Sequence, residues 1–99
     1  MRATVLFHRL AAREYRGARA WYSARSASVA ERFRIAVDRA VERVAAQAEA
    51  LPALSGPYRW VRIRGFPYLL IFRRQSPDVL MVVAVAHTSR CPGYWRHRT

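Results

Sequence analysis

The sequence predicts an α+β fold, in which a helical hairpin packs on one face of a mostly antiparallel sheet. Three observations lead to this prediction. An apolar stripe with helical spacing runs from Val29 to Leu51. From Ala53 onward the apolar pattern changes to that of strands. Serine, glycine and proline residues interrupt the patterns where elements would end. The expected order is strand, helix, helix and three strands (β-α-α-β-β-β), and 99 residues predict one domain over residues 1–99.

The N-terminal third predicts a short strand followed by a helix. Residues 4–7 form a β-type run with no helical continuation before Leu10, which predicts the first strand. Residues 10–25 predict the first helix, because side chains at spacings of three and four share one face. That face comprises Leu10, Ala11, Glu14, Tyr15, Ala18, Trp21 and Tyr22.

The second helix has the strongest periodic signal in the chain. Ser28 followed by Glu31 predicts a capping box at its start, and Pro52 ends it. A short serine-containing turn between the two helices predicts an antiparallel hairpin. The apolar stripe comprises Val29, Phe33, Ala36, Val37, Ala40, Val41, Val44, Ala48 and Leu51.

The C-terminal half predicts three strands in a meander. Residues 58–64 alternate in polarity, residues 66–74 form the next strand, and residues 75–78 make a hairpin loop. Residues 79–86 are continuously apolar, which is typical of a central strand buried on both faces. The helical hairpin must cover one face of this sheet. We expect the other face to carry Arg62, Arg64, Arg73 and the C-terminal tail.

The charge of the chain indicates an anionic partner. The formal net charge is +12, and all 18 basic residues are arginine. Such a charge is typical of proteins that meet nucleic acid, an acidic protein or an anionic membrane. Genomic GC bias explains part of the arginine excess. It does not explain the distribution, because residues 51–99 hold eight arginines and a single acid, Asp78.

The location of the protein follows from what the sequence contains. The longest apolar run, residues 79–86, is too short to span a bilayer, so no membrane partner is expected. Cys91 is the single cysteine, which excludes an intrachain disulfide and fits a reducing cytoplasm. The sequence predicts no oligomeric state.

One candidate binding feature lies in the first strand of the meander. Arg62 and Arg64 are two residues apart, so on a strand they point to the same face. With Trp60 they form a row of aromatic and basic side chains. Two interpretations stay open: a solvated outer face, or a functional groove.

A second candidate is the C-terminal segment, which groups His87, Arg90, Tyr94, Trp95, Arg96, His97 and Arg98. Histidine and tyrosine transfer protons, and arginine stabilises a pentavalent phosphorane. These are the parts of a metal-independent ribonuclease that uses the 2′-hydroxyl of its substrate. The alternative is structural: Tyr94 and Trp95 pack on the core, and His87 makes a hydrogen bond at the end of the last strand. For His87 we favour the structural role. No metal or cofactor is expected, since no ligand set has suitable spacing and no glycine-rich phosphate loop is present.

Several local sequences together resemble the RelE/ParE superfamily of type II toxins. They are Ala20-Trp21-Tyr22, Glu31-Arg32-Phe33, the run from Phe66 to Phe72, the run from Val83 to His87, and Arg90-Cys91-Pro92-Gly93-Tyr94-Trp95. The resemblance extends over nearly the whole chain. It implies a growth inhibitor that is neutralised by a cognate acidic antitoxin.

The resemblance implies two alternative targets. ParE-like members poison DNA gyrase, whereas RelE-like members cleave mRNA on the ribosome. A RelE-like nuclease would use Arg62, Arg73, His87, Arg90 and Tyr94, with Arg64 nearby. We favour gyrase, because the nuclease set usually includes lysine and this chain has none. A non-toxic basic nucleic-acid-binding domain is a third alternative. Residues expected to contact the target or the antitoxin are Trp60, Arg62, Arg64, Arg73, Arg90, Trp95, Arg96 and Arg98.

Overall fold

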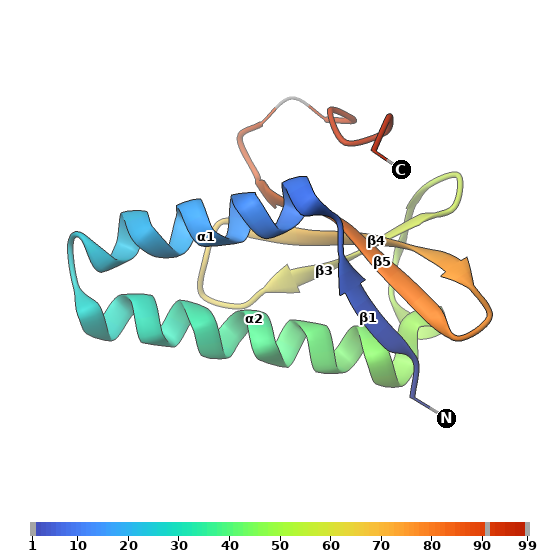
Figure 1. Ribbon diagram of the computed structural model, residues 1–99, viewed down its shortest axis with the longest axis horizontal. Coiled ribbons are helices and arrows are strands. Elements are labelled where there is room, and N and C mark those ends of the chain that lie inside the picture. The colour runs from blue at the N-terminus through green and yellow to red at the C-terminus, as the bar shows by residue number, and fades with distance from the viewer. Residues whose placement is uncertain (1, 91, 99) are drawn as a thin grey trace.

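The computed structural model describes residues 2–90 and 92–98, so Cys91 lies outside the described residues. The elements are β1 (Thr4–Phe7), α1 (Arg9–Ser23), α2 (Ala27–Gln47), a 3-10 turn (Ala48–Ala50), β2 (Ala53–Ser55), β3 (Tyr58–Ile63), β4 (Tyr68–Ser76) and β5 (Val79–His87) (Figure 1). The predicted order is confirmed, with one addition. The short strand β2 was not predicted, since three residues are too few to display a strand period.

The sheet is mostly antiparallel, as predicted. The strand order is β1-β5-β4-β3-β2, and only the pairing of β1 with β5 is parallel. The apolar run that predicted a central strand is β5, which lies between β1 and β4. Val82, Val83 and Val85 are buried because helices cover one face of the sheet there and the C-terminal tail covers the other.

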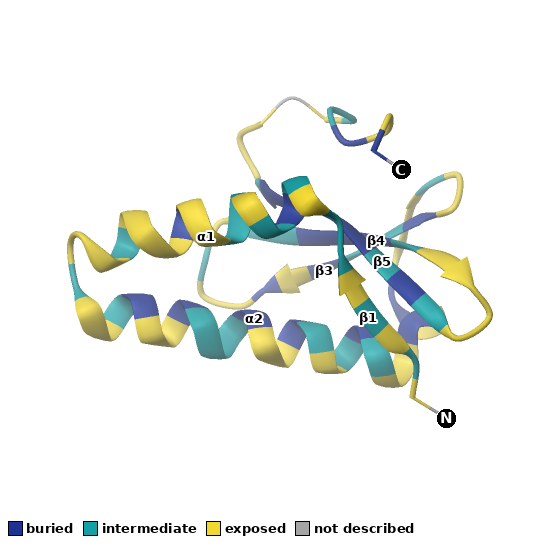
Figure 2. Cartoon of the chain, viewed as in Figure 1, coloured by how far each residue is buried: buried dark blue, intermediate teal, exposed yellow. Residues whose placement is uncertain are grey.

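The two helices lie side by side along one face of the sheet (Figure 1). Figure 2 shows buried residues recurring along α2, which is the apolar stripe read from the sequence. At the centre of this core, the fully buried ring of Phe33 contacts Tyr15, Tyr22, Phe66 and Tyr68 at centroid distances of 5.0 to 5.9 Å. Burial of this stripe, more than helix propensity, holds the hairpin on the sheet.

The predicted capping box of α2 is wrong. The N-cap is Ser26, whose hydroxyl accepts a hydrogen bond from the amide of Val29 at 3.3 Å. Because the helix begins two residues earlier than the box requires, Glu31 is too far along the helix to reach back to the N-cap amide. Glu31 instead accepts hydrogen bonds from Arg34.

The opposite face of the sheet carries a second, smaller core. The tail after β5 folds back, and its Trp95 packs with Tyr58, Ile71, Val83, Ala84 and Ala86. Trp95 is 5% exposed. The tail is also tied to β3, because the hydroxyl of Tyr58 donates to the carbonyl of Arg96 at 3.2 Å. Both faces of the central strands are therefore covered.

Strand β5 contains a bulge close to the edge against which the tail folds back. Ala84 pairs with Ile71 and Val82 pairs with Phe72, so Val83 is an extra residue in β5. The last pair between β1 and β5 joins Phe7 to Val82. Beyond it, no strand within residues 2–90 and 92–98 pairs with β5 on the side of α1. The backbone groups there need other hydrogen-bond partners.

Candidate functional site

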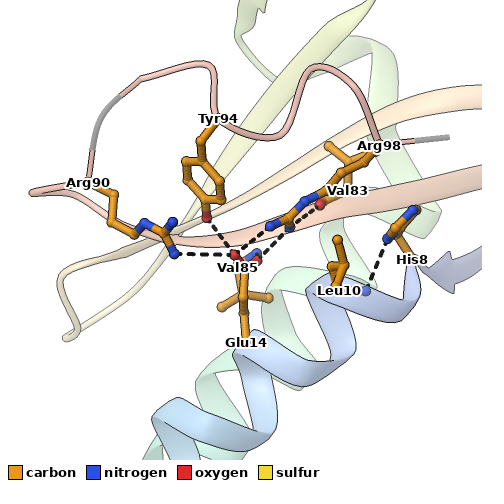
Figure 3. A network of polar contacts seen from close by, with 8 residues as sticks. All are labelled: His8, Leu10, Glu14, Val83, Val85, Arg90, Tyr94 and Arg98. Carbon is orange, nitrogen blue, oxygen red and sulfur yellow. Dashed lines mark hydrogen bonds and ion pairs between the residues drawn. The ribbon is translucent and has the colours of Figure 1, made fainter.

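The free edge of β5 is completed by two charged side chains. Glu14, in the second turn of α1, accepts a hydrogen bond from the amide of Val85 at 3.0 Å. Arg98 Nη1 donates to the carbonyl of Val83 at 2.8 Å and to Glu14 Oε1 at 3.0 Å (Figure 3). An ion pair thus supplies the donor and the acceptor that another strand would have supplied.

Glu14 contacts three polar side chains of the tail. Arg98 Nη2 donates to Glu14 Oε2 at 3.0 Å, which makes the pair bidentate, and the hydroxyl of Tyr94 donates to the same oxygen at 2.8 Å. Arg90 Nη1 lies 3.7 Å from Oε2, and its guanidinium lies 3.9 Å from the ring centroid of Tyr94. The side chains of Arg98 and Glu14 are 9% and 16% exposed. Two arginines of the tail therefore share one carboxylate.

Tyr94 is held in its protonated form. Burial raises the pKa of the Tyr94 hydroxyl well above its ordinary value, and its hydrogen bond to the negatively charged Glu14 raises the pKa further. A hydroxyl with such a pKa, already donating to a carboxylate, is poorly suited to transfer protons near neutral pH.

His87 is separated from Tyr94 by the sheet. By its pairing with Tyr68 it lies on the helix-covered face, where the two rings meet edge to face at 5.1 Å. Its Nδ1 accepts from the amide of Ser89 at 3.1 Å and lies 2.7 Å from the Ser89 hydroxyl. The ring thus makes a structural hydrogen bond in the turn after β5, as the favoured interpretation expected. The structure does not bring it together with Arg90 and Tyr94.

Other residues expected to contact a partner lie around the tail. Arg73 pairs with Met81, which places it on the tail-covered face, as expected, and Trp60 packs against the second core there. Arg96 is exposed, and its Nη1 donates to the hydroxyl of Ser55 at 2.7 Å. The expectation that Trp95 contacts a partner at the surface is wrong, because its ring is buried in the second core.

Arg62 and Arg64 do not join the tail. They line a hollow of about 610 Å³ between β3 and α2, which we call the arginine groove. Its lining comprises Arg32, Ile35, Ala36, Arg39, Ala40, Glu42, Arg43, Arg62 and Arg64. Arg62 pairs with Leu69, which packs against the second core, so Arg62 leaves β3 on the tail-covered face, as predicted. The short β2 pairs with Tyr58 and Arg59, and the carbonyl of Pro52 accepts from the amide of Trp60. Among the described residues no strand pairs with the edge of β3 beyond that point, so the long side chain of Arg62 reaches round this edge to the hollow beside α2.

The charge of the arginine groove is not compensated from within. Its single acid, Glu42, is held by Arg2 at 2.5 Å. Among the described residues, the five arginines of the groove have no hydrogen-bond or ion-pair partner through their side chains. A larger hollow of about 760 Å³, near the N-terminus, differs in this respect, because Glu49 and Asp78 accompany its arginines and Glu49 pairs with Arg74.

Sequence reasoning missed Glu14 as a site residue. The sequence placed the carboxylate on the helix face that carries Leu10, Ala11 and Ala18, but no partner for this charge was predicted. A carboxylate among residues destined for burial is itself a signal, since buried charges are almost always paired. The partner was not identifiable, because Arg98 lies 84 residues further along the chain.

Within residues 2–90 and 92–98, no three histidine, cysteine or acidic side chains are grouped so that they could hold a metal ion. In the same part of the chain, no helix is both long and apolar enough to cross a membrane.

Comparisons with known proteins match the fold and most of the chain. A family model described as "ParE toxin of type II toxin-antitoxin system, parDE" matches residues 5–92. A solved structure titled "Chromosomal ParDE TA system from P. aeruginosa" superimposes with a TM-score of 0.72 at 13% identity, covering 86% of this chain and 95% of that chain. At that identity the likeness concerns the fold. A search of curated proteins found no significant match. The family match includes Glu14 and Arg90 but ends before Tyr94 and Arg98.

Proposed function

The chain belongs to the ParE toxin family of type II toxin-antitoxin systems, and from this membership we propose that it inhibits growth by binding DNA gyrase, without cleaving nucleic acid, until an acidic antitoxin neutralises it. Gyrase is the target that the sequence resemblance favoured. The basic character of the chain, with a net charge of +12, supports an acidic neutralising partner.

The non-enzymatic proposal rests on the contacts that Glu14 makes with the side chains of the tail. A nuclease needs an available general base and cations free to meet a phosphate. Here the hydroxyl of Tyr94 donates to Glu14, and both Arg90 and Arg98 are paired with the same carboxylate. The histidine that would complete the set, His87, lies on the other face of the sheet. This arrangement supports binding over catalysis.

Controlled expression in bacteria tests the proposal. We expect growth arrest with DNA damage, and we expect the purified protein to inhibit supercoiling by gyrase. The 5′ ends of translated mRNAs should be unchanged. Position-specific mRNA cuts with normal supercoiling would instead support the RelE-like alternative. Normal growth at confirmed expression of folded protein would contradict both toxin assignments.

Two variants sharpen this test. Tyr94→Phe removes the hydroxyl, and Arg90→Ala removes the exposed arginine paired with Glu14. If the protein acts by binding gyrase, supercoiling inhibition should survive in Tyr94→Phe whenever circular dichroism shows a native fold. A folded Tyr94→Phe or Arg90→Ala protein that loses both toxicity and mRNA cleavage would contradict the non-enzymatic proposal.

A further inference from the structure

We propose that the outer face of α1 binds the phosphate backbone of duplex DNA. The surface is formed by Arg9, Arg13 and Arg16, which we call the α1 arginine row. The inference rests on the proposed function for the identity of the DNA, since the duplex is the one that gyrase holds while it is inhibited. In this arrangement the chain contacts the enzyme and its DNA together.

The α1 arginine row lies on the side of the helix that faces solvent. Arg13 and Arg16 follow Arg9 by four and seven residues, so the three side chains fall within an arc of about 60° around the helix axis. The buried residues of α1, Ala11 and Ala18, lie on the opposite side. The three arginines are exposed, and Figure 2 shows exposed residues recurring along this helix. A ligand can therefore reach the row along its whole length.

No carboxylate balances the charge of the row. Among the described residues, its three side chains form no hydrogen bond and no ion pair. The one acid of α1, Glu14, accepts from the backbone of β5 and binds the tail. The second helix differs, because Arg34 on α2 pairs with both Glu31 and Asp38. The outer face of α1 is therefore basic without the mixture of signs that is usual on a solvated helix.

This arrangement of charge is unfavourable for the helix that carries it. Arg9 stands in the first turn of α1, where the helix dipole is positive and where no acidic residue is present. Arginines three or four residues apart on a helix also repel each other. Phosphates bound along this face oppose both effects, because each places a negative charge near the row.

The spacing of the row fits a nucleic-acid backbone. Arg9 and Arg16 are seven residues apart, which is about 10 Å along the helix axis. A DNA strand presents one phosphate per about 3.4 Å of its axis, so about three phosphates lie along this length. The row thus offers one guanidinium to each phosphate.

The side chains beside the row favour DNA over an acidic protein. Ala12 and Ala20 are the neighbours of the row on this face, and both are small. Protein interfaces depend on large apolar or aromatic anchors at their centre, with charges at the rim. A surface that offers charge without such an anchor is better suited to phosphates, which are bound by arginine irrespective of base sequence.

The first experiment measures binding of the full chain to a fluorescein-labelled duplex of about 20 base pairs, by anisotropy, between about 50 and about 200 mM salt. In the row variant, glutamine replaces the three arginines of the row. Glutamine matches arginine in helix propensity, and circular dichroism checks the fold. The row variant is Arg9→Gln/Arg13→Gln/Arg16→Gln.

The control variant removes three arginines that are each paired with a carboxylate on the surface. It lowers the net charge by the same amount, but its guanidinium groups already have anionic partners. The control variant is Arg2→Gln/Arg34→Gln/Arg74→Gln.

We expect the row variant to bind the duplex at least about tenfold more weakly near 0.1 M salt, and the control variant to stay within about threefold of wild type. The slope of log K against log salt should fall by about 2.7 in the row variant, at about 0.9 for each lost phosphate contact. Equal losses in both variants would overturn the proposal, because binding would then depend only on net charge. Polyglutamate that binds as tightly as the duplex, with the same dependence on the row, would overturn the assignment to DNA.

The second experiment places the row at the proposed target. The row variant should require at least about tenfold more protein than wild type to inhibit supercoiling by half, and the control variant should stay close to wild type. A folded row variant that inhibits as well as wild type overturns the role of the row at gyrase, while the proposed function stands. If the wild-type chain does not inhibit gyrase, the proposed function fails, and the duplex titration still decides whether the row binds DNA.

Discussion

The arginines of the tail and those of the arginine groove carry the same charge in opposite surroundings. Arg98 is 9% exposed and forms a bidentate pair with Glu14, and Arg90 lies 3.7 Å from the same carboxylate. In the groove, Arg39 and Arg62 line an open hollow without a paired carboxylate among the described residues. A dense run of arginines in the sequence is thus no guide to which of them is available to a partner.

The difference has a physical cause. A guanidinium removed from water must recover its hydration from hydrogen bonds and an opposite charge. Glu14 and the carbonyl of Val83 supply these to Arg98. An exposed guanidinium keeps its water and tolerates having no partner. The tail cluster therefore contributes to stability, and the groove is free to contribute to binding.

The largest expected effect comes from breaking the tail cluster. Glu14→Gln leaves the buried guanidinium of Arg98 without its counter-charge, and we expect a loss of about 3–5 kcal/mol in the free energy of unfolding, measured with urea. Glu42→Gln is the matched control, because Glu42 pairs with Arg2 on the surface. That control should cost less than about 1 kcal/mol.

The double variant Glu14→Gln/Arg98→Met separates charge burial from packing. Removing both members of a buried pair costs less than removing one, so the double variant should recover part of the stability lost in Glu14→Gln. A double variant less stable than Glu14→Gln would show that Arg98 stabilises the tail independently of Glu14.

A smaller effect is expected from Tyr94→Phe. This change deletes a hydrogen bond to a charged group, at an expected cost of about 1.5–3 kcal/mol near neutral pH. Because folding raises the pKa of Tyr94, the folded chain holds that proton more tightly than the unfolded chain. The hydroxyl's contribution to stability is therefore complete below the unfolded tyrosine pKa of about 10 and declines as pH rises above it.

Urea titrations between pH 8 and pH 11 measure this decline. The gap in unfolding free energy between wild type and Tyr94→Phe should narrow as the pH rises. The raised pKa values of Tyr22 and Tyr68 affect both proteins, so the difference isolates Tyr94. A gap that stays constant or widens with pH would contradict the assigned role of the hydroxyl.

The smallest effect on stability is expected when a carboxylate is introduced into the arginine groove by substitution. In Ala36→Glu, the new carboxylate lies one turn from Arg32 and from Arg39 on α2, and each such pair contributes about 0.2–0.5 kcal/mol. Thermal unfolding should therefore place Ala36→Glu at or slightly above Ala36→Gln, its control for size. An Ala36→Glu protein that is less stable than Ala36→Gln would show that the arginines of the groove gain nothing from an added carboxylate.

The fold was largely predictable from the sequence, and the site was not. The order of elements and the helical hairpin follow from apolar periodicity, the interior position of β5 follows from its continuous apolar run, and the structure agrees with them. The predicted N-cap of α2, Ser28, lies two residues after the observed N-cap, Ser26. Serine is a favourable N-cap at either position, so the local sequence does not distinguish the two. The sequence placed Arg62 on the correct strand. It did not predict that Arg62 lines a hollow together with the arginines of α2, because this depends on where the short β2 ends.

The helices, most of the strands, the apolar stripe that joins them and the surplus of positive charge can be predicted from the amino-acid order. These are local properties, because periodicity and composition are carried by neighbouring residues. Which arginines are paired with a carboxylate depends on the folded arrangement of the chain. Tyr94 and Arg98 lie 80 and 84 residues from Glu14 in the chain, and the fold alone brings them within hydrogen-bonding distance of it. Chain separation leaves no local trace of such a pairing, whereas the energy of a buried charge depends wholly on it.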